Sequence, residues 1–86
     1  MPSTVHVETP DLSSASNLRR QLLDFDSSLE ALPEGRWKVS TEVFSEGLNA
    51  KMEVDQILGL VHDWLAAQKL ASTTVQLGSG TYLMLQ

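Results

Sequence analysis

Two segments of the chain alternate apolar and polar residues, a pattern that predicts β-strands. In residues 4–8, Val5 and Val7 share one face, and Pro10 follows shortly after and ends the run. Residues 36–44 alternate over a longer stretch. The expected buried face of this second strand comprises Trp37, Val39, Thr41 and Val43. Because successive side chains of a strand point to opposite faces, each strand is predicted to bury one side only.

The segment between these strands has the periodicity of a helix. Its apolar residues recur at spacings of three and four: Ala15, Leu18, Leu22, Phe25, Leu29 and Leu32. At 100° per residue they fall on one arc, which predicts one helix of about 18 residues. A serine among residues 13–16 is the expected N-cap, and the tripeptide 33–35, Pro-Glu-Gly, ends the helix. Alternatively, Ser27 and Glu30 form a capping box that splits the segment into two helices.

Residues 50–70 predict a second helix, with Asn49 as its cap. Its apolar stripe comprises Val54, Ile57, Leu58, Val61, Trp64 and Leu65. Residues 73–77 and 81–85 are short runs typical of strands, and the sequence Gly78-Ser79-Gly80 between them predicts a tight hairpin turn.

The expected order is therefore βαβαββ in one domain, residues 1–86. A strand–helix–strand crossover normally joins parallel strands. The sequence thus predicts an α/β (α+β) fold in which two helices pack on a small mixed sheet of four strands.

Composition narrows the classes of function. The chain has 86 residues, 42% of them hydrophobic, and no cysteine, so disulfides and thiolate metal sites are excluded. The net charge of −5 argues against nucleic acid as a partner, and the adjacent Arg19 and Arg20 are expected on a solvated helix face. The longest apolar run, residues 57–61, is far shorter than the about 20 residues that span a membrane. With no leader-like start, a cytoplasmic protein without membrane contact is predicted.

Candidate chemistry is sparse. His6 and His62 lack the short ligand spacing of a metal site. Ser79 lies between two predicted strands, whereas a nucleophile elbow joins a strand to a helix. Asp24 and Asp26 are not followed by the rest of a calcium loop. We therefore predict no catalytic, cofactor-binding or metal-binding residue. The alternative is a small enzyme or ligand-binding domain that uses a histidine in a cleft.

Two places suggest an interface. Leu60 lies off the core arc of the second helix, beside Trp64. Leu83 and Leu85 belong to an apolar strand that is followed by Gln86 without a polar tail. Such a strand is expected to be either central in the sheet or an edge that awaits a partner. Leu60, Trp64, Leu83 and Leu85 are therefore the predicted interface residues, although Trp64 also suits the core.

The layout, with the sequence Leu-Arg-Arg-Gln-Leu at 18–22 and Trp64-Leu65 late in the second helix, is similar to small effector-associated components of bacterial conflict systems. This similarity lies in the order of the elements and implies no site residue. The predicted function is a protein-interaction or regulatory module without catalytic activity, which binds another protein or itself as a homodimer. An accessory subunit of a larger bacterial assembly is the further alternative.

Overall fold

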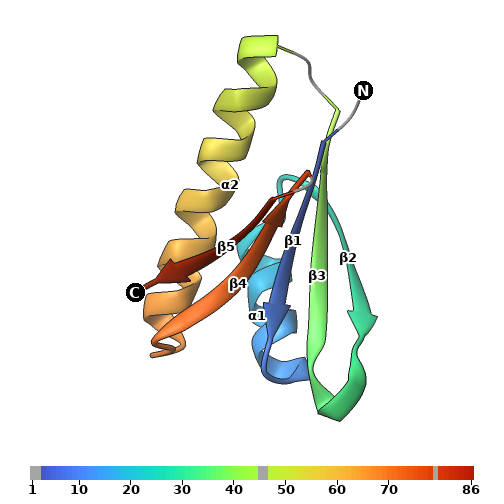
Figure 1. Ribbon diagram of the computed structural model, residues 1–86, viewed down its shortest axis with the longest axis vertical. Helices are drawn as coiled ribbons and strands as arrows, with labels where there is room; N and C mark the ends of the chain where they lie inside the picture. Colours follow the sequence, from blue (N-terminus) through green and yellow to red (C-terminus); the bar gives the residue numbers. More distant parts are fainter. Residues whose placement is uncertain (1–2, 45–46, 79) are drawn as a thin grey trace.

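The computed structural model describes residues 3–44, 47–78 and 80–86. Within them, strands and helices follow one another in a single α+β arrangement (Figure 1). The elements are β1 (Ser3–Thr9), α1 (Leu12–Gln21), β2 (Asp26–Ala31), the one-turn 3-10 helix η1 (Pro33–Gly35), β3 (Trp37–Val43), α2 (Gly47–Ala67), β4 (Ser72–Leu77) and β5 (Gly80–Leu85). The α+β class, both α-helices and the strands β1, β3, β4 and β5 confirm the sequence-based predictions.

The sheet has the order β2-β3-β1-β4-β5, and every neighbouring pair is antiparallel. The predicted sheet of four mixed strands is therefore wrong in number and direction. Since β1 and β2 both run antiparallel to β3, they share a direction but are not neighbours, and β3 and β4 are separated by β1 in the same way. β1, α1 and β2 therefore form a split βαβ unit with β3 between its strands, and β3, α2 and β4 form a second one with β1 between its strands. Two such interleaved units make a ferredoxin-like arrangement, to which β5 adds a fifth strand.

Residues 26–31 form strand β2, where the sequence predicted helix. The helix α1 stops at Leu22, whose N–H still bonds to the carbonyl of Leu18 at 3.0 Å, and the N–H of Phe25 then closes a turn on the carbonyl of Leu22 at 2.9 Å. β2 pairs with β3 along its whole length, so Ser27 does not cap a second helix. Both versions of the helical prediction for this segment are wrong, because the strand's pairing with β3 overrides the local periodicity.

The predicted helix caps also differ from those observed. Asp11 caps α1, because its Oδ1 accepts a bond of 2.7 Å from the N–H of Ser14. A carboxylate of this kind satisfies a free N–H in the first turn, so no serine is needed. The helix α2 begins at Gly47, which places Asn49 inside it. It ends at Ala67, three residues earlier than expected, and Lys69 then takes a left-handed conformation (φ 58°).

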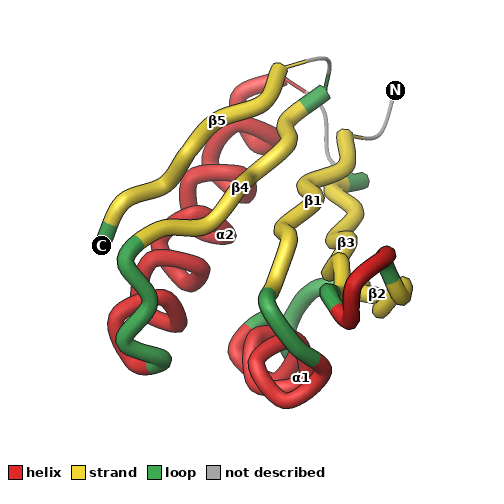
Figure 2. The backbone as a smooth tube through the Cα atoms, turned by 60° about the horizontal axis from the view of Figure 1, so that its bottom comes forward, coloured by secondary structure: helices red, strands yellow, loops and turns green. Residues whose placement is uncertain are grey.

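Both helices lie on one face of the sheet, and the core fills the space between (Figures 1 and 2). The buried core comprises Val5, Val7, Ala15, Leu18, Leu22, Val39, Val43, Ile57, Val61, Trp64, Leu65 and Val75. Trp64 also joins the two helices, because its indole N–H donates to the carbonyl of Ser14 at 2.9 Å. The opposite face of the sheet is left open. In the part of the chain that the structure describes, no helix is long and apolar enough to cross a membrane.

Candidate functional site

The strand β5 lies at one edge of the sheet. Its one neighbour among the described strands is β4, with Thr74 opposite Leu83 and Val75 opposite Tyr82. Figure 2 shows β5 as the outermost strand, with its far side uncovered by another strand. The main chain of β5 is therefore available for pairing along that side.

The register identifies which backbone groups point outward. The N–H of Gln86 donates to the carbonyl of Ala71 at 3.0 Å, so these two residues form a hydrogen-bonded pair. Hydrogen-bonded and non-hydrogen-bonded pairs alternate along an antiparallel ladder. It follows that Thr81, Leu83 and Leu85 belong to the non-hydrogen-bonded pairs of β4 and β5. Their N–H and C=O groups consequently face the free edge.

The strand β5 carries four large hydrophobic side chains, and three of them are exposed. Leu83 and Leu85 are 64% and 65% exposed on the open face of the sheet, and Tyr82, on the face that bears the helices, is 57% exposed. No residue of β5 is charged. The strand at the opposite edge, β2, carries the exposed carboxylates of Asp26 and Glu30. Since charges are a usual protection of edge strands against pairing, β2 is protected and β5 is not.

A shallow apolar groove runs beside this edge, between the hairpin and α2. Its volume is about 260 Å³. Its lining residues are Leu58, Val75, Leu77, Tyr82, Leu83 and Met84. We call the groove together with the exposed hydrophobic side chains of β5 the β5 edge.

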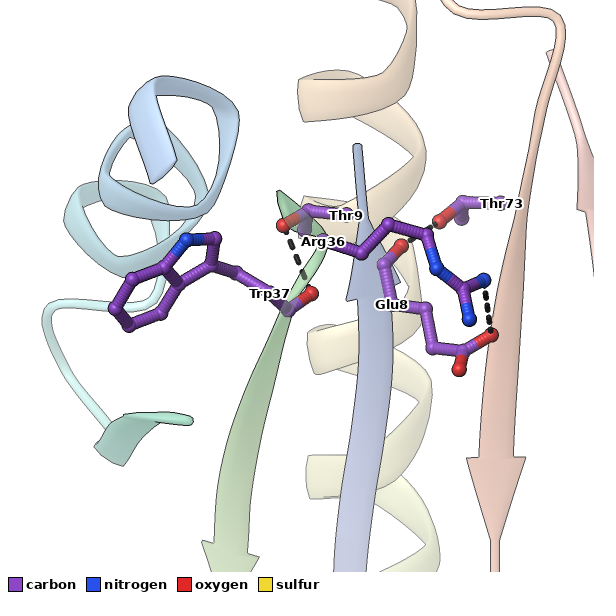
Figure 3. Close-up of polar contacts among 5 residues, drawn as sticks. All are labelled: Glu8, Thr9, Arg36, Trp37 and Thr73. Atoms are coloured by element: carbon purple, nitrogen blue, oxygen red, sulfur yellow. Dashed lines mark hydrogen bonds and ion pairs between the residues drawn. The ribbon is translucent and has the colours of Figure 1, made fainter. Parts of the chain in front are cut away.

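The hairpin is held to the centre of the sheet by buried threonines (Figure 3). The hydroxyl of Thr73, at the base of β4, donates to the carbonyl of Glu8 at 2.6 Å. The hydroxyl of Thr9 donates to the carbonyl of Trp37 at 2.9 Å, which ties β1 to β3. On the open face, Arg36 Nη1 lies 3.9 Å from Glu8 Oε2. The β5 edge is thus fixed to the rest of the sheet through β4 and β1.

The turn of the hairpin depends on glycine. Gly78 has a left-handed conformation (φ 56°), which glycine adopts without strain. A Cβ atom at Gly80 would lie 2.9 Å from the hydroxyl of Tyr82, so the tyrosine side chain lies over this glycine. The predicted hairpin is confirmed, and Ser79 of the predicted turn lies outside the described residues.

The structure separates the four predicted interface residues. Leu83 and Leu85 lie together on β5, as described above. Leu60 is half-buried and packs against the core, and Trp64 is 2% exposed, so its side chain belongs to the interior. An interface role for Leu83 and Leu85 stays a prediction. Tyr82 was missed, and the alternation of the strand, which separates it from Leu83, is the signal that places it beside the helices.

The two histidines lie on different parts of the surface and do not converge. His6 lies on the open face, where its Nδ1 is 2.7 Å from the hydroxyl oxygen of Ser40. His62 is exposed on α2. Partial burial lowers the pKa of His6, and the positive charge of Lys38 lowers it further, while Glu30 acts in the opposite direction. Within residues 3–44, 47–78 and 80–86, no three histidine or carboxylate side chains gather to hold a metal ion.

We expect His6 to make the domain less stable in mild acid. Because its pKa in the folded state lies below the usual histidine value of 6.5, the unfolded chain binds the proton more readily. The folded state has its full stability above pH 6.5, where the imidazole is neutral in both states. Part of this stability is lost as the pH falls from that value through the lowered pKa of the folded state. Urea titrations at about pH 7.5 and pH 5.5 should show this loss, and His6→Gln should reduce it. The matched variant His62→Gln should keep the wild-type loss, and an unchanged loss in His6→Gln would contradict the assignment.

The open face of the sheet offers little to a nucleic acid. Its central positions hold Glu8, Lys38, Ser40 and His6, and the imidazole of His6 is the one aromatic ring among them. Sheets that bind RNA on this face stack the bases on aromatic side chains, and carboxylates repel phosphates. The expectation that nucleic acid is not the partner stays a prediction, and these residues agree with it.

A second exposed apolar group lies where β3 ends and α2 begins. It comprises Phe44, Leu48 and Met52, which are 62%, 73% and 61% exposed. Unlike the β5 edge, it lies beyond a strand's end and on a helix, so it offers no row of strand backbone groups for pairing.

Comparison of the chain with protein families, with curated proteins and with solved structures finds no match.

Proposed function

We propose that the chain is a protein-interaction module without catalytic activity, which pairs through the β5 edge with a strand of another protein or of a second copy. One observation carries this proposal. β5 is an uncharged edge strand whose Thr81, Leu83 and Leu85 direct their backbone groups outward, beside the apolar groove. The chain contains no cysteine, which suits a reducing compartment, and we place the interaction in the cytoplasm as part of the same proposal.

Strand addition is the mode of recognition that these features support. In this mode the backbone of the added strand bonds to the exposed sheet edge, and side-chain pockets select its sequence. The backbone groups of β5 supply the first element. The groove beside Leu58 and Tyr82 supplies the second, because it accepts apolar side chains on the helical face of an added strand.

Leu83→Lys is expected to weaken binding at the β5 edge at least about tenfold, which corresponds to about 1.4 kcal/mol. A lysine on an edge strand opposes pairing because its charge must be desolvated. The probe is a set of extended peptides selected from a random library against the wild-type chain at nanomolar concentration. Their affinity for the variant is then measured by fluorescence anisotropy.

Ser28→Lys provides the control for that experiment. Ser28 is exposed at a matching open-face position on β2, the other edge of the sheet. We expect this variant to bind the selected peptides as the wild type does. Both variants should keep the wild-type free energy of unfolding to within about 0.5 kcal/mol in urea titrations, as exposed substitutions do. Failure to select any peptide, together with a monomeric chain, would contradict the proposed function, and so would equal binding by Leu83→Lys and the wild type.

A further inference from the structure

We infer that the occupant of the β5 edge is a second copy of this chain, with the two β5 strands antiparallel about a two-fold axis at Leu83. This inference rests on the proposed function and specifies its partner and register. In this register Leu83 pairs with Leu83 of the second copy, and Thr81 pairs with Leu85 in both directions. The two sheets then join into one continuous sheet.

The backbone pattern selects this register. The outward-facing residues Thr81, Leu83 and Leu85 are symmetric about Leu83, so each meets an outward-facing residue of the other copy, as hydrogen-bonded pairs require. With the axis at Leu83, all residues from Gly80 to Gln86 find a partner. An axis at Tyr82 pairs a shorter stretch, because the turn before Gly80 is reached sooner.

The side chains match in the same register. On the open face, Leu83 meets its counterpart, and the two Leu85 side chains lie diagonally beside them, within reach of contact in an antiparallel pair. On the helical face, Tyr82 lies opposite Met84 of the second copy, an aromatic–thioether pair that is favourable. These side chains cover the groove beside Leu58 in both copies. Side chains that are exposed in one copy therefore become buried in the pair.

The distribution of charge directs self-pairing to this edge. Each chain carries a net charge of −5, so two copies repel each other at long range. The residues from Gly80 to Gln86 include no charged side chain, whereas pairing through β2 would add Asp26 and Glu30 of both copies to one interface. Because salt screens the long-range repulsion, the dissociation constant of the dimer is expected to fall as ionic strength rises.

Cysteine scanning tests the register directly, since the chain contains no native cysteine. In a hydrogen-bonded pair the Cα atoms are about 5.5 Å apart, a separation that a disulfide can span. Leu83→Cys is therefore expected to give a covalent dimer on mild oxidation or with a short bifunctional thiol reagent. Thr81→Cys alone should not, because its two copies lie about 13 Å apart along the strands. A mixture of Thr81→Cys and Leu85→Cys should give covalent heterodimers.

Ser28→Cys, on the opposite edge, reports the background of random collisions. Sedimentation equilibrium of the unmodified chain at about 100 μM measures association without a cross-link, since even weak micromolar self-association is detected there. A monomer without selective cross-linking at position 83 would overturn self-pairing. A dimer that cross-links more readily through Thr81→Cys alone, or through Ser28→Cys, would overturn it as well. If such a chain still bound the selected peptides and Leu83→Lys did not, the proposed function would stand without self-pairing.

Discussion

Trp64→Ala is expected to leave the domain largely unfolded at 25 °C. The indole is 2% exposed and lies between α2 and α1. Removing a buried tryptophan side chain costs about 3–5 kcal/mol. The carbonyl of Ser14 also loses its indole donor and keeps its helical one, so the lost hydrogen bond adds about 0.5–1.5 kcal/mol. The sum approaches or exceeds the total stability of about 5 kcal/mol that is common for small domains.

Circular dichroism with urea titration measures this effect. Trp64→Phe separates the two contributions, because it keeps an aromatic side chain in the core and removes only the N–H donor. We expect Trp64→Phe to fold with a lowered midpoint and Trp64→Ala to lack a cooperative transition. A cooperative transition of Trp64→Ala near the wild-type midpoint would show that the indole does not stabilise the packing of the two helices.

Leu22→Ala and Val61→Ala are each expected to lower the free energy of unfolding by about 2–4 kcal/mol. Both side chains are fully buried, Leu22 at the end of α1 and Val61 in the middle of α2. Each truncation removes apolar contacts and leaves a cavity between the helices and the sheet. Because a small domain has little stability in reserve, either variant should melt at a much lower urea concentration.

Leu23→Ala is the matched control, one residue along the chain from Leu22. Leu23 is 82% exposed, so its truncation should change the free energy of unfolding by less than about 0.5 kcal/mol. A difference of that small size for Leu22→Ala would show that the side chain does not contribute to the core as the structure indicates.

The strand β2 shows where sequence patterns stop being sufficient. Phe25, Leu29 and Leu32 continue the spacing of α1, and no glycine or proline separates them from the helix. An edge strand with one open face needs few apolar residues, and in β2 only Leu29 supplies a large one. The pairing of β2 with β3 decides its conformation, and this is information from distant residues. β3 itself was predictable because Val39, Thr41 and Val43 alternate along a well-buried strand.

The candidate site was predictable in part for a similar reason. Leu83 and Leu85 stand out in the sequence as apolar residues of a short strand, and both are exposed. Whether that strand is central or at an edge depends on the order of all the strands, which local patterns do not contain. Leu60 and Trp64 were chosen from angular positions on a helical wheel. The angles on one helix do not show that α1 packs against it, and it is Ser14 of α1 that accepts the hydrogen bond from the indole of Trp64.

The central position of β1 also constrains how the chain folds as it is synthesised. β1 is made early, yet it pairs with β4, and the bond between Thr73 and Glu8 joins residues 65 positions apart. Contacts of such long sequence separation slow folding, because the intervening loop must close first. Until β4 has left the ribosome, the edge of β1 that pairs with β4 has no partner. A nascent chain that pauses before Ser72 should therefore bind chaperones that recognise exposed apolar strands, and release from them should follow the emergence of β4.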